Sequence, residues 1–147
     1  MDIETTLFDL DLVLLHLRQI GIAFLLALPI AINREHRARG AGLRTFPLVA
    51  VACCAFMLVG MDVYADGEAQ ARVMYGVITG MGFIGGGSII KQGDQTQGTA
   101  TAAGIWLTGA IGISVAYLRY EIALLLSLIG FLIFQFSEYA KSGRNDL

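Results

Sequence analysis

The chain has 147 residues, of which 56% are hydrophobic and 15% are charged, and its formal net charge is −2. A soluble domain of this size carries about 25% charged residues, so the composition favours a membrane protein and leaves no room for a separate soluble domain. We expect the lipid bilayer as surroundings and no nucleic-acid partner, since a nucleic-acid binder needs a concentration of positive charge.

Five long runs are almost free of charge: Leu12–Ile32 (interrupted by Arg18), Phe46–Met61, Val73–Ile90, Thr99–Tyr117 and Ile122–Phe136. At 1.5 Å per residue the first, third and fourth can cross a hydrocarbon core about 30 Å thick, whereas the second and fifth are short. We predict an all-α membrane protein, a compact bundle of five transmembrane helices, with four spans and one interfacial helix as the alternative. The expected parts are an acidic segment 1–11, a membrane domain 12–139 and a tail 140–147.

The distribution of charge predicts the orientation of this bundle. With the N-terminus outside, the inner segments hold seven basic and four acidic residues, and the outer segments hold two basic and eight acidic ones. Because basic residues accumulate in cytoplasmic loops, we expect an N-out, C-in topology. The first residues are acidic where a signal peptide is basic, so no cleavable signal peptide is expected.

The run Val73–Ile90 carries six glycines and no charge. In a bilayer such a segment stays helical, and its small residues let other helices approach closely. We interpret it as the central helix of the bundle. The residues expected to form its contact surfaces are Gly76, Gly80, Gly82, Phe83, Gly85 and Gly87.

The run Thr99–Tyr117 has a second small-residue face, formed by Ala100, Gly104, Thr108 and Gly112 at intervals of four. These two helices are therefore expected to pack on each other. Trp106 lies in mid-span, where its indole N–H needs a partner, so we expect it to face protein rather than lipid. Thr101 is a further candidate on this helix.

Several charged residues are candidates for specific roles. Arg18 is read in two ways, as an interfacial anchor whose side chain reaches outward or as an interior charge paired with Asp62 or Asp66. On the inner side, Arg44 is expected to contact lipid phosphate or a partner, within a cationic loop that attracts anionic headgroups. On the outer side, Arg72 is expected to pair with Asp66 or a neighbouring acid.

A metal site is only weakly indicated. Asp62, Asp66 and Glu68 could hold a hydrated Mg²⁺ or Ca²⁺, but their spacing is not that of an EF-hand, and a solvated acidic loop is favoured. The sequence has no P-loop, no His/Cys cluster and no GxSxG motif, and its GxGxxG-like glycines follow no strand. We therefore expect neither an enzyme nor a bound cofactor, with Mg²⁺ as the weak exception.

Four blocks together resemble a known family: Arg18 with Asn33-Arg34-Glu35, the run Ala41–Thr45, Arg72 with Gly80–Gly87, and Gly98–Ala103 leading to Trp106 and Gly112. They are similar to the membrane domain of the MgtC/SapB family of bacterial inner-membrane proteins. The chain departs from that family at Asn33, where a Glu is usual, and we expect it to be without the C-terminal soluble domain of many members.

The resemblance implies a multi-pass protein of the bacterial inner membrane, associated with growth at low Mg²⁺ and, in pathogens, with survival inside host cells. It favours a membrane regulator acting through glycine-rich helices on another membrane protein, such as the F-type ATP synthase, or on membrane potential. The alternative is an oligomeric Mg²⁺ transporter or channel that uses unwound Gly85–Gly87 carbonyls as ligands. The residues that match the family motifs are Arg18, Arg34, Glu35, Arg44, Thr45, Asp66 and Arg72, and all of them except Thr45 are charged.

Overall fold

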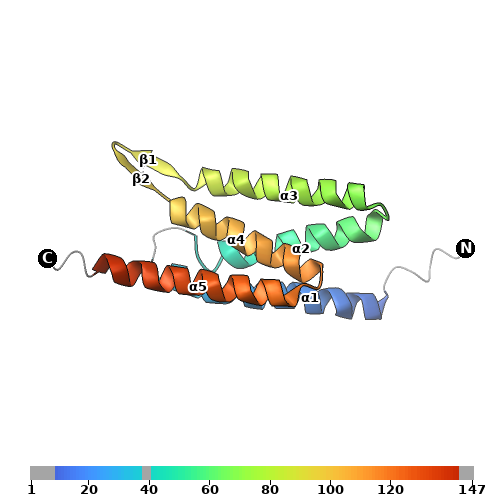
Figure 1. The fold of residues 1–147 in the computed structure, drawn as a ribbon. Coiled ribbons are helices and arrows are strands. Elements are labelled where there is room, and N and C mark those ends of the chain that lie inside the picture. Colours follow the sequence, from blue (N-terminus) through green and yellow to red (C-terminus); the bar gives the residue numbers. More distant parts are fainter. Residues whose placement is uncertain (1–8, 38–40, 143–147) are drawn as a thin grey trace, which may run out of the picture.

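A computed structural model of the chain describes residues 9–37 and 41–142. Within them the chain forms five helices and one β-hairpin (Figure 1). The helices are α1 (Leu10–Arg37), α2 (Thr45–Val63), α3 (Gly67–Gly87), α4 (Thr99–Ala116) and α5 (Tyr120–Ser142), and the hairpin strands are β1 (Ile90–Gln92) and β2 (Gln95–Gln97). The predicted helical class is confirmed. Most of segment 1–11 and of tail 140–147 lies outside the described residues.

Among the described helices, α1, α2 and α4 are long and apolar enough to cross a membrane, and α5 contains a shorter apolar stretch, Tyr120–Phe136. This differs from the expectation that the first, third and fourth runs reach across most easily. The second helix extends beyond its apolar run at both ends, to 19 residues. In α3, glycines and the polar residues of its first turns lower the mean hydropathy. Five crossings and the N-out, C-in orientation stay predictions.

The central helix of the bundle is α4, which packs on each of the other four helices. In Figure 1, α3 runs along one edge of the molecule, with α4 between it and α5. Only Met81 and Gly85 of α3 are buried. The expectation that Val73–Ile90 forms the central helix is therefore wrong. The reason is that α4 has buried side chains around most of its circumference, whereas α3 meets its neighbours along one narrow seam.

The core lies where α1, α2 and α4 meet, and α5 closes it. Ile30, Phe46, Met57, Ile111 and Val115 are all fully buried there. Lipid tails are as apolar as these side chains, so close van der Waals packing rather than the hydrophobic effect favours these contacts in a bilayer.

Helix α1 continues through Pro29, which has no N–H to donate and disrupts the hydrogen-bond ladder in its turn. In the same turn the carbonyl of Leu26 accepts a 2.6 Å hydrogen bond from the hydroxyl of Ser127 on α5. In the first half of α1, the side-chain amide of Gln19 donates to the carbonyl of Ala116, the last residue of α4, over 3.4 Å. Buried polar groups thus tie α1 to its neighbours at separate points.

The loop between α3 and α4 is an exposed antiparallel hairpin, in which Lys91 lies opposite Thr96. The sequence 91–98 is polar and contains two glycines, and no strand was expected there. Gly98, which ends the hairpin, has φ +88°, and a Cβ there would overlap the carbonyl of Ser88. Glycine is thus required where the chain turns into α4.

Candidate functional site

The glycines of α4 are filled by neighbouring helices. A Cβ at Gly104 would lie 2.8 Å from Cε1 of Phe46 and 3.1 Å from Cζ of Phe134, and one at Gly112 would overlap the carbonyl of Ala50. Phe46 and Ala50 belong to α2, so the small-residue face of α4 packs chiefly on α2. Helices α3 and α4 also pack on each other, as predicted. This face is therefore part of the fold of the single chain.

The glycines of α3 are mostly open. A Cβ at Gly76, Gly80, Gly82 or Gly87 would meet nothing within 4 Å, whereas one at Gly85 would lie 3.3 Å from the carbonyl of Ala102 on α4. The large side chains between them are also uncovered: Phe83 is 86% exposed and Tyr75 is 73% exposed. Of the predicted contact surface on α3, only Gly85 meets another helix of this chain.

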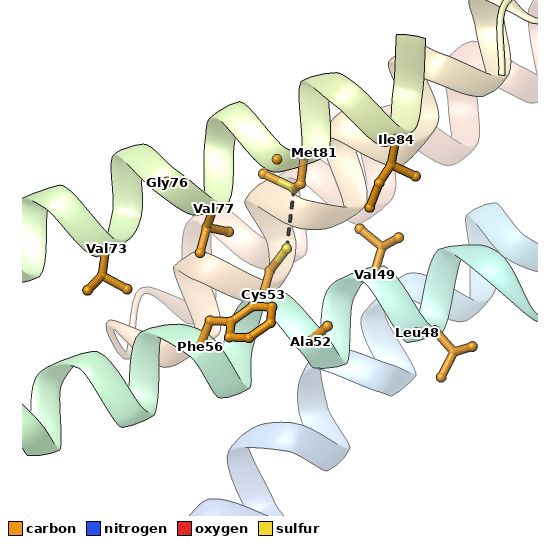
Figure 2. Close-up of a pocket in the computed structure, with 11 residues that line it drawn as sticks. Leu48, Val49, Ala52, Cys53, Phe56, Val73, Gly76, Val77, Met81 and Ile84 are labelled. Atoms are coloured by element: carbon orange, nitrogen blue, oxygen red, sulfur yellow. Dashed lines mark hydrogen bonds between the residues drawn. The ribbon is translucent and has the colours of Figure 1, made fainter. Parts of the chain in front are cut away.

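An apolar groove separates α2 from α3 and has a volume of about 560 Å³ (Figure 2). We call it the α2–α3 groove. Its wall on α2 includes Leu48, Cys53 and Phe56, and its wall on α3 includes Gly76 and Gly80 together with Val77, Met81 and Ile84. The Cys53 thiol donates a hydrogen bond to the sulfur of Met81 over 3.3 Å, shown as the dashed line in Figure 2. The groove therefore has a floor where the two helices touch and an open side lined by glycine.

A polar cluster lies at the end of the bundle where α1 and α5 finish and α4 begins. One guanidinium nitrogen of Arg34 donates to the hydroxyl of Thr101 over 3.4 Å, and its Cζ lies 5.0 Å from the ring centroid of Phe134. Beside it, the amide of Asn33 donates to Oε1 of Gln135 over 2.8 Å. We call these five residues the Arg34 cluster.

The Arg34 cluster brings together three residues that the sequence analysis named, Asn33, Arg34 and Thr101, and two that it missed. Phe134 and Gln135 were included only as part of the apolar run Ile122–Phe136. Gln135 is the single amide in the run Ile122–Phe136, and that isolated polar residue was the available signal, since a side-chain amide within an apolar span needs a hydrogen-bonding partner.

Glu35 folds the next segment back onto α1. Its carboxylate accepts a 2.9 Å hydrogen bond from the N–H of Leu43, and a side chain at Gly42 would collide with it. Thr45 then begins α2, while the side chain of Arg44 is exposed and makes no capping hydrogen bond. The role of the Ala41–Thr45 block in this chain is thus partly structural, because it closes the turn between α1 and α2.

At the opposite end the acidic residues are engaged locally. The Asp66 carboxylate accepts a 3.1 Å hydrogen bond from the N–H of Ala69 and caps α3. Arg72 pairs with Glu68 at 3.6 Å, with both side chains more than 80% exposed. Arg72 thus meets a neighbouring acid rather than Asp66, one turn earlier on its own helix.

For Arg18 and for the weakly indicated metal site, the sequence left two readings open. In the described part of the chain, Arg18 is exposed and forms no ion pair with Asp62 or Asp66. No group of three or more His, Cys, Asp or Glu side chains is placed to hold a metal ion in the same part of the chain. Asp62, Asp66 and Glu68 are therefore not gathered into a ligand set, and Mg²⁺ binding stays a prediction.

Two further expectations are wrong. Trp106 is 56% exposed, so in the single chain it does not face protein. Its position on α4 lies outside the contacts with α2, which use the glycine side of the helix. Gly85–Gly87 are not unwound: α3 is helical through Gly87, and the carbonyls of Gly85 and Gly86 accept from the N–H groups of Ser88 and Ile89. A closed helical end offers fewer free carbonyl ligands than an unwound one.

The fold defines a helical membrane protein whose helices pack closely through small residues, and three of its described helices are long and apolar enough to cross a bilayer. A family model described as "MgtC family" matches residues 20–142. The chain belongs to the MgtC family.

Curated relatives agree with this assignment. The chain is 35% identical over 113 residues to "Putative magnesium transporter YhiD" of Escherichia coli (strain K12), covering 72% of this chain and 53% of that protein. It is 33% identical over 129 residues to Protein SrpB of Synechococcus elongatus, covering 75% and 71%. It is 41% identical over 91 residues to Protein MgtC of Brucella abortus (strain 2308), covering 62% and 38%.

The chain spans about half the length of the first of these relatives and less of the third. No solved structure matches it. The similarity thus fixes the family and its membrane helices, and the activity of the longer relatives does not pass to this chain without further argument.

Proposed function

We propose that this chain is a regulator in the bacterial inner membrane that serves adaptation to low Mg²⁺ by docking a helix of another membrane protein onto α3. The observation that carries the proposal is the contrast in packing: the space beside the glycines of α4 is filled by α2, α3 and α5, whereas most glycines of α3 face open space. The link to magnesium comes from the family and from the printed name of the Escherichia coli relative.

The physical argument starts from the cost of glycine in a helix. An interior glycine costs about 1 kcal/mol relative to alanine, so a helix that carries several needs a compensating contact. In a bilayer that contact is the close approach of another helix, because helices there associate through small residues and van der Waals packing. Gly76 and Gly80 line the α2–α3 groove, where an incoming helix would approach α3.

The shape of the groove agrees with a helix as the occupant. Its walls are apolar side chains, and the Cys53–Met81 contact forms its floor. Phe56 and Leu48, 60% and 66% exposed, flank the open side and supply apolar area for a second helix. A membrane subunit of the F-type ATP synthase is the partner that the family resemblance suggests, with membrane potential as the property regulated.

The test is complementation of growth at low Mg²⁺ in a strain that lacks the gene. Gly80→Leu places a bulky side chain in the groove, and the structure has free space for it, so the protein should accumulate and fold normally while complementation is lost. Gly21→Leu is the matched control, because Gly21 on α1 is equally open but far along the chain from α3. Full complementation by Gly80→Leu and Gly76→Leu would refute the docking role of α3.

The second candidate is an oligomeric Mg²⁺ transporter or channel, and the name of the Escherichia coli relative favours it. The helical ends of Gly85–Gly87 and the separate engagement of Asp66 and Glu68 weigh against the mechanism expected for it. Mg²⁺ flux into proteoliposomes that contain only this protein separates the two. Uptake that Asp62→Asn and Asp66→Asn abolish would establish transport and overturn the regulator.

A further inference from the structure

The guanidinium of Arg34 is held in place by neutral groups only. It lies in the last turn of α1, where it donates to Thr101 and stacks over the ring of Phe134. Both contacts fix the direction of the side chain without neutralising it. The Asn33–Gln135 hydrogen bond beside it ties α1 to α5 and keeps that part of the two helices together.

The positive charge of Arg34 has no counter-charge in the described part of the chain. No carboxylate there forms an ion pair with it, and the nearest acid in sequence, Glu35, accepts from the N–H of Leu43 instead. The Nε–H of Arg34 is buried without a hydrogen-bonding partner. A guanidinium has five N–H donors, and leaving a buried one unsatisfied is unfavourable, so the arrangement indicates a missing acceptor.

Thr101 and the first turn of α4 supply further hydrogen-bond donors beside Arg34. The Thr101 hydroxyl accepts from Arg34 and keeps its own proton to donate, and the residue is 8% exposed. It stands in the first turn of α4, where Gly98 supplies no side-chain cap, so the first N–H groups of the helix have no side-chain acceptor. The N-terminal end of a helix also favours an anion.

We propose that Arg34 and Thr101 bind a phosphate oxyanion, carried by a phospholipid headgroup or free in solution, at the end of the bundle where α4 begins. Arg34 would donate through its guanidinium, and Thr101 through its hydroxyl. A phosphate presents several acceptor oxygens, which suits a guanidinium and a hydroxyl that converge from two helices.

The position of Arg34 favours phosphate over other anions. It follows directly on the apolar stretch of α1, at the depth where headgroup phosphates meet the ends of membrane helices. The basic segment that follows it carries Arg44, exposed at the start of α2. The acidic residues Asp62, Asp66 and Glu68 lie where α2 ends and α3 begins. Figure 1 shows this turn at the opposite end of the bundle from the start of α4, so the field near Arg34 favours anions.

The test measures binding by the full chain in maltoside micelles, which contain no phosphate, in about 0.15 M salt to screen long-range attraction. One arm titrates inorganic phosphate and the other titrates phosphatidylglycerol, each followed by the rise in melting temperature and by native mass spectrometry. Arg34→Gln should weaken binding roughly tenfold, as expected for loss of one charge-assisted contact. Lys91→Gln on the exposed hairpin removes the same charge at the same end and should change affinity less than twofold.

Thr101→Val keeps the shape and charge of the cluster and should weaken binding severalfold, so it decides the question if Arg34→Gln fails to fold. Binding in the phosphate arm alone would assign a soluble source, and binding in the lipid arm would assign a headgroup; either supports the proposal. It is overturned if the wild-type protein binds neither probe, if Thr101→Val binds as wild type does, or if Lys91→Gln weakens binding as much as Arg34→Gln.

Discussion

Helices α3 and α4 have nearly the same kind of sequence and opposite surroundings. Both lack charge over most of their length and carry glycine at helical spacing, yet α4 is enclosed by its neighbours and α3 is covered along one seam. Glycine spacing alone therefore shows that a helix can be approached closely and does not show by what. For α4 the approaching helix belongs to the same chain. For α3 we infer that it belongs to another.

The largest expected difference between α3 and α4 appears when the same bulky side chain replaces a glycine in each helix. Gly112→Leu would force leucine into the carbonyl of Ala50 and the backbone of Cys54 on α2, neither of which can turn aside. We expect a loss of more than about 3 kcal/mol, at the upper end of overpacking costs, and little folded protein. Gly76→Leu meets open space and should leave stability unchanged or raise it by about 1 kcal/mol through helix propensity.

Both variants can be compared by size-exclusion profile and by resistance to SDS-induced unfolding in mixed micelles. If Gly112→Leu and Gly76→Leu are equally stable in these measurements, α4 does not pack against α2 as closely as described.

The next largest effect concerns the one large side chain that α3 buries. Met81 touches Cys53 on α2, and a Cβ at Gly109 on α4 would overlap it, so it fills the junction of three helices. Met81→Ala should cost about 2–5 kcal/mol and loosen α3 from the bundle. Phe83→Ala, an equally drastic truncation of an exposed residue, should cost less than about 0.5 kcal/mol.

Hydrogen exchange of α3 amides in detergent is the measurement for this pair. Faster exchange confined to α3 is expected in Met81→Ala, and none beyond wild type in Phe83→Ala. If the α3 amides exchange at the same rate in both variants, the contacts of Met81 do not fix α3 to the bundle.

A smaller effect is expected at the start of α3. Asp66 caps this helix through the N–H of Ala69, so Asp66→Ala should cost about 1 kcal/mol while Asp66→Asn, which keeps the capping oxygen, should cost much less. Circular dichroism and thermal unfolding of the purified variants give the answer. A larger loss in Asp66→Asn than in Asp66→Ala would point to a charge-dependent role instead of a cap.

The smallest effect is expected for the Arg72–Glu68 pair. Its members are one turn apart and highly exposed, so Arg72→Gln should change stability by less than about 0.5 kcal/mol, and added salt should reduce even that difference. Thermal unfolding at low and high salt measures it. A change above about 1 kcal/mol would show that Arg72 has a partner outside the described residues or in another molecule.

The number and order of the helices could be predicted because each apolar run is bounded by charge, glycine or proline. Which helix occupies the centre could not, because that depends on how side chains such as Phe46 and Phe134 enter the spaces left by Gly104. Both phenylalanines look like lipid-facing residues in sequence. A pattern on one helix does not specify the shape of the helix that meets it.

The candidate sites divide along the same line. Gly80 was singled out from spacing, and the structure adds that its space is empty. Arg34 and Thr101 were also named, but 67 positions separate them, and nothing local predicts that one donates to the other. The short hairpin was missed because strands of three residues have no periodicity to detect.

The proline of α1 has a mechanical consequence. Pro29 weakens α1 at one turn, because it has no N–H to donate. In that turn the hydroxyl of Ser127 donates to the carbonyl of Leu26, so α5 supports α1 where its own hydrogen-bond ladder is interrupted. Beyond Pro29, the side-chain amide of Asn33 donates to Gln135, which also belongs to α5. The last turns of α1, which carry Arg34, are therefore held to α5, and we expect the two segments to move together.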